Sequence, residues 1–217
     1  MMVVSGPNGS GKTIYMKQTA IIIFLAHLGI YVPAEIAEVP MIDKIVMVDA
    51  GRSIYNSKDI SGFEAEMASL SRLTTPGLIT NKSLVLIDEL GSSVDTKIAE
   101  RLLATTILFL SDNRKNHILL KPEIDVKVKK FYREQRSSSH VSYEMSKFTV
   151  PLCIVVTHLT EIVHSQSITE NEQIRFLTMD MERGQVSSFK IAPGVVKTGY
   201  GIECAKPYLG EGITHNA

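Results

Sequence analysis

The fold of this 217-residue chain is decided by Gly6-Pro7-Asn8-Gly9-Ser10-Gly11-Lys12-Thr13, which satisfies the pattern Gly-x-x-x-x-Gly-Lys-Ser/Thr. An apolar run at residues 2–5 precedes this loop, and residues 12–28 follow it with the apolar spacing of a helix. Glycines let successive backbone N–H groups face the α- and β-phosphates of a nucleotide, and the helix directs its positive N-terminal dipole at the same anion. Lys12 then reaches the β/γ oxygens, and the Thr13 hydroxyl ligates Mg²⁺. The flanking elements favour this site over a glycine-rich turn without function.

Short apolar runs and helical patterns alternate along the rest of the chain. The strands are expected at residues 44–48, 84–87 and 152–156, the helices at 62–73 and 95–110, and a hairpin from 175–181 and 186–191. This alternation predicts an α/β layered fold around a largely parallel sheet. The most apolar run, residues 20–32, is too short to cross a bilayer and is expected to be a buried core helix, with Ile14, Ile21, Leu25 and Leu28 at helical spacing.

The formal net charge of zero, from 23 basic and 23 acidic residues, conceals an uneven distribution. Residues 114–147 contain nine basic and four acidic residues, a net charge of +5, whereas the remaining 14 basic and 19 acidic residues give −5. A βαβ crossover does not require this length of chain. The insertion is either a solvated surface loop or an arm that contacts DNA or a partner protein, because its lysines and arginines lie beside Phe131 and Tyr132.

Two acidic residues follow the apolar strand pattern Leu84-Val85-Leu86-Ile87. Because side chains alternate along a strand, Asp88 and Glu89 are expected to point in different directions. One carboxylate then supports Mg²⁺ through its water shell while the other polarises the attacking water. The alternative is a pair of acids that merely ends the strand. His158 follows the run at residues 152–156 and is either structural or a sensor of the γ-phosphate.

These motifs, in this order, resemble those of the ATPase domain of the MutS family of DNA mismatch-repair proteins, a branch of the ABC-type ATPases. The further matching segments are Gly29-Ile30-Tyr31-Val32-Pro33-Ala34, Ser61-Gly62-Phe63-Glu64-Ala65-Glu66-Met67, Thr157-His158-Leu159-Thr160-Glu161, and Gly199-Tyr200-Gly201-Ile202 with Ala205-Lys206. The resemblance spans nearly the whole chain outside residues 114–147. Ile14-Tyr15-Met16-Lys17-Gln18, Val32-Pro33-Ala34-Glu35 and Phe176-Leu177-Thr178-Met179 are similar to the meiotic branch, MutS homologue five.

The resemblance implies a P-loop NTPase sandwich of three layers and ABC type over residues 1–217, with an ATPase activity that uses ATP and Mg²⁺. The implied nucleotide-binding residues are Gly6, Pro7, Asn8, Gly9, Ser10, Gly11, Lys12 and Thr13. The implied catalytic residues are Glu89, His158 and Lys12, and the implied Mg²⁺ ligands are Thr13 and, through water, Asp88. The partner would be a second MutS-type subunit, identical or different. Ser61 and Gly62 of one subunit would then face the γ-phosphate held by the other.

In full-length members, ATP binding would join the subunits and hydrolysis would release them, which drives clamp movement on mismatched or branched DNA. The family's DNA-reading domains would lie upstream of residue 1, so DNA contact is expected through them or through residues 114–147. A nuclear location in a eukaryote follows if the meiotic branch is right, and otherwise an intracellular location is expected, with no membrane partner. Two cysteines cannot form a disulfide framework, which favours a reducing compartment.

Two departures from the family pattern leave the activity open. Gly62 stands where the family has threonine, and Ser92-Ser93-Val94 replaces a segment that reads Arg/Lys-Gly-Thr. These changes favour a second function class, a nucleotide-binding dimerisation module with little or no turnover. A third alternative is another ABC-type DNA ATPase head, against which the Val32-Pro33-Ala34 turn and the strand at residues 83–89 argue.

Overall fold

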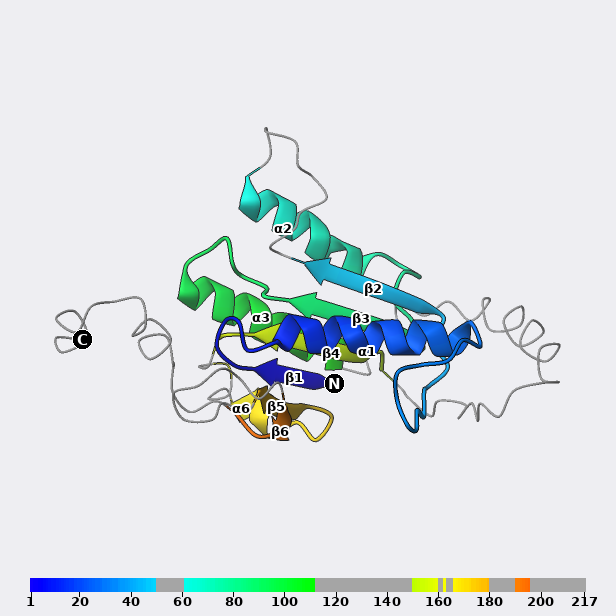
Figure 1. Ribbon diagram of the computed structural model, residues 1–217. Coiled ribbons are helices and arrows are strands. Elements are labelled where there is room, and N and C mark those ends of the chain that lie inside the picture. The colour runs from blue at the N-terminus through cyan, green and yellow to red at the C-terminus, as the bar shows by residue number, and fades with distance from the viewer. Residues whose placement is uncertain (50–60, 112–149, 160–161, 163–165, 180–189, 196–217) are drawn as a thin grey trace, which may run out of the picture.

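The computed structural model describes residues 1–49, 61–111, 150–159, 162, 166–179 and 190–195. Its centre is a six-stranded sheet in the order β2-β3-β4-β1-β5-β6 (Figure 1). The strands are β1 (Met2–Ser5), β2 (Lys44–Asp49), β3 (Ser83–Asp88), β4 (Leu152–Thr157), β5 (Arg175–Met179) and β6 (Ile191–Pro193). All neighbouring pairs are parallel except β5 and β6. The predicted α/β fold with a mostly parallel sheet is confirmed.

Helices cover both faces of this sheet, which gives three layers (Figure 1). They are α1 (Lys12–His27), α2 (Gly62–Ser71), the 3₁₀ helix η1 (Arg72–Thr74), α3 (Thr96–Ser111) and the short α6 (Gln166–Thr169). Helix α1 packs on one face, and α3 with η1 and α6 packs on the other. Parallel strands covered in this way are buried on both sides, which explains why their sequences are continuous apolar runs.

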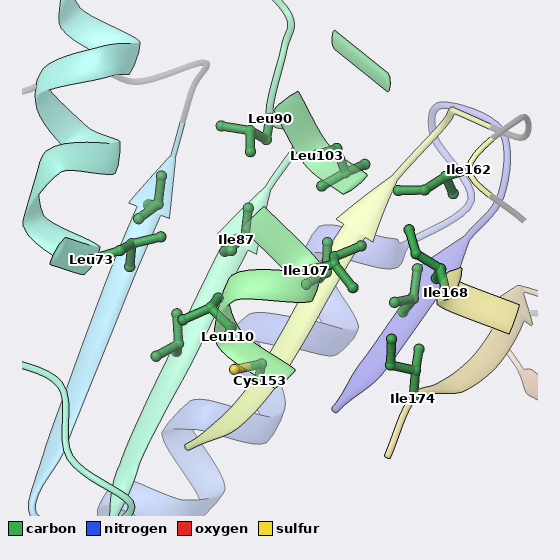
Figure 2. Packing of buried hydrophobic residues seen from close by; sticks show 14 of the residues in the cluster. Leu73, Ile87, Leu90, Leu103, Ile107, Leu110, Cys153, Ile162, Ile168 and Ile174 are labelled. Atoms are coloured by element: carbon green, nitrogen blue, oxygen red, sulfur yellow. The ribbon is translucent and has the colours of Figure 1, made fainter. Parts of the chain in front are cut away.

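Strand β3 shows how one apolar run serves two cores. Val85 and Ile87 pack in one hydrophobic cluster with Leu103 and Ile107 of α3. Figure 2 labels Ile87, Leu103 and Ile107 in this cluster. The alternate residues Leu84 and Leu86 join the cluster on the α1 side. Each of these side chains is at most 2% exposed, and such burial stabilises the fold by about 1.5–3 kcal/mol per side chain.

The prediction that residues 20–32 form a buried core helix is wrong about which side chains are buried. Helix α1 is present, but Ile14, Ile21 and Leu28 are 66%, 56% and 57% exposed. The face that packs on the sheet instead carries Met16, Ala20, Ile23 and Ala26. Because this helix is apolar on nearly every side, the sequence pattern does not indicate which face the sheet covers.

The other predicted elements lie within a few residues of the observed ones. The helix expected at residues 62–73 divides into α2 and η1, and the expected hairpin is present as the antiparallel pair of β5 and β6. The described part of its second strand is Ile191–Pro193, and residues 180–189, which include most of the strand expected at 186–191, lie outside the described ranges.

Several sequence features fall outside the described residues. These are the basic insertion at residues 114–147, Thr160 and Glu161, and the motif at residues 199–206. In the part of the chain that is described, no helix has the length and apolarity needed to cross a bilayer.

The order of the strands determines where the polar motifs meet. Strand β4 lies between β1 and β3, with Val4 opposite Val156 and Val156 opposite Asp88. Because β1 to β4 are parallel, their carboxyl ends lie at one edge of the sheet, where α/β folds place their ligands.

Candidate nucleotide site

The loop between β1 and α1 is shaped around its lysine. Gly11 is the residue that caps α1, and its φ of 94° lies in the left-handed region that glycine adopts without strain. The carbonyl of Pro7 accepts hydrogen bonds from the Ser10 amide at 3.3 Å and from the Lys12 ammonium at 2.8 Å. The loop therefore curls back over the Lys12 side chain.

The ammonium group of Lys12 is held inside this loop. Lys12 is only 4% exposed, and burial lowers the pKa of its ammonium, while the nearby Glu89 and Asp88 carboxylates raise it. A buried cation that contacts a carbonyl oxygen is stabilised further when an anion comes within hydrogen-bonding distance. The loop thus supplies a positive charge, at the N-terminus of a helix, for a phosphate group.

Asp88 lies directly beneath Thr13, the first residue after this lysine. The Thr13 hydroxyl donates a hydrogen bond to Oδ1 of Asp88 at 2.9 Å. Asp88 is 6% exposed, and burial raises its pKa, an effect that Asp49 and Glu89 increase and the Thr13 hydrogen bond opposes. Crowded carboxylates of this kind are stabilised by a divalent cation, and Mg²⁺ prefers hydroxyl and carboxylate oxygens.

Glu89 leaves the sheet in a different direction from Asp88. Its φ is 49°, which is unusual for a residue other than glycine, and its amide donates to the carbonyl of Val156 at 3.0 Å. Glu89 lines a pocket of about 200 Å³ together with residues of the phosphate loop. The other lining residues are Gly9, Gly11, Lys12, Thr13 and Ile14. The two acids therefore occupy separate positions, one beneath Thr13 and one facing the pocket.

His158 is brought to the same edge of the sheet but not into this pocket. It follows β4, the strand between β1 and β3, and its side chain is exposed. The pocket lining does not include it. Its assignment as a γ-phosphate sensor therefore stays a prediction.

Ser61 and Gly62 lie apart from the pocket, at the start of α2. Helix α2 packs against the core through Leu70 and Ala65 and follows the edge strand β2 (Figure 1). Ser61 caps this helix, and a Cβ on Gly62 would meet Ser93 Cβ at 3.5 Å, an ordinary contact. The structure therefore leaves room for a larger residue at position 62, and the role of both residues toward a partner stays a prediction.

Two acidic residues were given no role of their own by the sequence analysis, although Glu66 lies within the segment at residues 61–67 quoted there. Asp49 ends β2 opposite Asp88 in the sheet register, so it belongs to the same carboxylate group. The signal was an acid directly after an apolar strand, as for Asp88. Glu66 is a buried carboxylate on α2. The sequence feature that could have indicated its burial is a charged residue that lies between apolar positions of a helix.

Comparison with known proteins gives a consistent assignment. The family model described as MutS domain V matches residues 2–123. The chain is 28% identical over 207 residues to MutS protein homolog 5 of Saccharomyces cerevisiae, covering 95% of this chain and 21% of that protein. It is 30% identical over 209 residues to the DNA mismatch repair protein MutS of Streptococcus suis, covering 95% and 20%. The MutS protein of Clostridioides difficile is 43% identical over 94 residues, covering 43% and 10%.

The chain spans about a fifth of the length of the relatives that match nearly all of it. The family model covers more than half of the chain and includes the phosphate loop, the strand β3 with Asp88 at its end, and Glu89. This assignment disagrees with the alternative of an ATPase head from another ABC-type group. The chain belongs to the MutS family and carries that family's domain V.

Proposed function

We propose that this chain is the ATP-binding and ATP-hydrolysing domain of a MutS-type protein, with the fold of an ABC-type P-loop NTPase. The observation that carries the proposal is that Lys12, Thr13 and Glu89 line one pocket at the edge of the sheet, while the Thr13 hydroxyl is hydrogen-bonded to Asp88 behind it. A cation, a pair of oxygen ligands and a separate carboxylate are the groups that nucleotide hydrolysis requires.

The residues present fit ATP and Mg²⁺. The phosphates would lie against the loop amides and the Lys12 ammonium, and the adjacent Thr13 and Asp88 would hold Mg²⁺, the latter through water. Bound Mg²⁺ would neutralise charge on the phosphate oxygens. Glu89 lines the pocket and would accept a proton from the attacking water. His158, which follows β4, would sense the γ-phosphate.

The wider function follows from the family rather than from the geometry. A second MutS-type subunit, identical or different, would place its own Ser61 and Gly62 opposite the nucleotide held here. ATP-driven association would then act on mismatched or branched DNA through other regions of a longer protein or through residues 114–147. The similarity to a MutS protein homolog 5 supports a meiotic role in the nucleus.

The test compares the whole chain with its Glu89→Gln and Lys12→Ala variants, using a fluorescent ATP analogue for binding and released phosphate for turnover. Glu89→Gln keeps the size and a hydrogen-bonding group but removes the base. We expect nucleotide affinity within about threefold of the unmodified chain and turnover lower by roughly 10²- to 10⁴-fold.

The second function class predicts a different turnover rate for the Glu89→Gln variant. In a dimerisation module with little turnover, which the glycine at position 62 and Ser92-Ser93-Val94 favour, the unmodified chain and Glu89→Gln hydrolyse ATP equally slowly. Nucleotide binding would still be weakened in Lys12→Ala. That result would retain the nucleotide site and reject the enzyme.

A further inference from the structure

A buried carboxylate on α2 is bonded to the turn that follows Glu89. Glu66 is 2% exposed, and its Oε1 accepts from the Gly91 amide while its Oε2 accepts from the Ser93 hydroxyl. A carboxylate is costly to bury unless such donors satisfy it. The burial of Glu66 is therefore explained by these two contacts, which join residues 25 and 27 positions apart in the sequence.

The turn that Glu66 contacts permits little movement. Gly91 is buried, has a φ of 94°, and a Cβ placed on it would come within 2.4 Å of Ala99 Cβ in α3. Only glycine fits this close approach. Leu90, immediately before it, is also buried in the core (Figure 2).

Glu89 is thus fixed from two sides. Its own amide is bonded to Val156 of β4, and two residues later the Gly91 amide is bonded to Glu66 of α2. A left-handed backbone at a residue other than glycine persists only where the surroundings hold it in place. The contact with α2 is therefore one of the hydrogen-bonded anchors that hold Glu89 toward the pocket.

The same helix begins at Ser61, five residues before Glu66. At 1.5 Å per helical residue the two positions are separated by about 7–8 Å along α2. The first turn of this helix also approaches Ser93, since a Cβ on Gly62 would lie 3.5 Å from Ser93 Cβ. A displacement of the start of α2 would therefore be transmitted to the turn after Glu89.

We infer that Glu66 is a positioning residue that couples the two nucleotide sites of a dimer. Glu66 connects helix α2 with the turn that follows Glu89. Helix α2 presents Ser61 to the nucleotide of a partner subunit, and the turn orients Glu89 toward the nucleotide of this chain. This inference rests on the proposed function, because it needs Glu89 as the base and Ser61 as the contact in trans.

The decisive variants are Glu66→Ala, Glu66→Gln and Ser93→Ala, each in the whole chain. Alanine removes both acceptors. Glutamine keeps the shape, and its amide can accept from Gly91 and donate to the Ser93 hydroxyl. Leu70→Ala, a half-buried position on the same helix, is the control for lost packing without loss of this contact.

In Glu66→Ala we expect kcat to fall by about 10- to 100-fold, because misplacing a catalytic group by about 1 Å has an effect of this size. The dissociation constant for the fluorescent ATP analogue should change by less than about threefold, since the phosphate loop is untouched. Glu66→Gln should recover most of kcat, Ser93→Ala should lie between, and Leu70→Ala should lower the thermal midpoint while keeping kcat.

Amide hydrogen exchange supplies a readout that does not depend on turnover. Without nucleotide, Glu66→Ala should speed exchange at residues 89–93 and in the first turn of α2, and Leu70→Ala should not. With Mg-ATP, the first turn of α2 should gain protection in the unmodified chain and not in Glu66→Ala.

The outcomes separate this inference from the proposed function. If the unmodified chain neither binds nor hydrolyses ATP, the proposed function fails, and the nucleotide-free exchange experiment still decides whether Glu66 fixes the turn. If the unmodified chain hydrolyses ATP and a folded Glu66→Ala does so at the same rate, the positioning role is rejected.

Discussion

Two helices of this chain begin at positions expected to meet phosphate, and they begin in different ways. Helix α1 starts after Gly11, which has no side chain to cap it, and its first turn contains no acidic residue. Helix α2 starts after Ser61 with a capping box, in which the Glu64 amide donates to Ser61 Oγ and the Glu64 carboxylate accepts from the Ser61 amide.

The difference concerns where the negative charge at each helix N-terminus comes from. The dipole and the unpaired amides of a helix N-terminus attract anions. At α2 the chain supplies that anion itself through Glu64, whereas the first turn of α1 contains a lysine and no acidic residue. In the proposed function a phosphate would bind at α1 without displacing an acidic side chain, but at α2 it would compete with Glu64.

The largest effect is expected from removing the cation at α1. Lys12→Ala should raise the dissociation constant of a fluorescent ATP analogue by about 10- to 150-fold, because hydrogen bonds to charged groups contribute about 1.5–3 kcal/mol. The thermal midpoint should stay the same or rise, since burial disfavours the charged lysine. Lys97→Ala, an exposed lysine at the start of α3, is the control. Equal affinity in both variants would show that α1 is not the anion site.

The next largest effect is expected at the carboxylate beneath Thr13. Because burial raises the pKa of Asp88 above 3.8, the folded chain holds this proton more tightly than the unfolded chain does. The unfolding free energy without nucleotide should therefore fall as pH rises from 3.8 through the raised pKa.

Asp88→Asn removes this titration while keeping an oxygen that can accept from Thr13. The variant should be more stable than the unmodified chain at pH 7 without ligand, and its apparent Mg²⁺ affinity with ATP should be about 10- to 100-fold weaker. Thermal unfolding from pH 4 to pH 8, with and without Mg-ATP, measures both. The same pH dependence in both proteins would contradict the role assigned to this carboxyl.

A smaller effect is expected from opening the cap of α2. Ser61→Ala should lower the free energy of unfolding by about 1 kcal/mol, because the Glu64 amide loses its acceptor. Urea denaturation measures this, with Ser71→Ala near the other end of the helix as the control. Loss of stability in the control alone would show that the capping box is not what holds the start of α2.

The smallest effect is expected from Glu64→Gln. This variant tests the difference between the two helix starts most directly. Glutamine can still complete a capping box, so only about 0.3–1 kcal/mol of charge–dipole stabilisation should be lost. With the carboxylate gone, a partner's γ-phosphate meets less repulsion, and ATP-driven association should tighten by a few-fold in sedimentation experiments. Unchanged or weaker association would indicate that Glu64 does not compete with phosphate.

The sequence predicted the first residue of both helices, Lys12 of α1 and Gly62 of α2, but it did not predict the contacts of Glu64 at the second. The spacing of glycines, Lys12 and Thr13 is a local requirement of phosphate binding, so the residues themselves indicate the site. The capping box of α2 is also local, yet only the structure shows that the Glu64 carboxylate already accepts from the Ser61 amide, which is the contact a phosphate at this helix start would have to replace.

The sequence by itself determined the order of strands and helices, the phosphate loop and the acids that end β3, because each depends on neighbours within a few residues. Only the tertiary structure decided that β4 separates β1 from β3, which face of α1 is buried, and that Glu66 holds the turn after Glu89. These features join residues tens of positions apart. The periodicity of apolar residues does not predict such pairings, because the same pattern allows a strand or helix to pack beside several different elements.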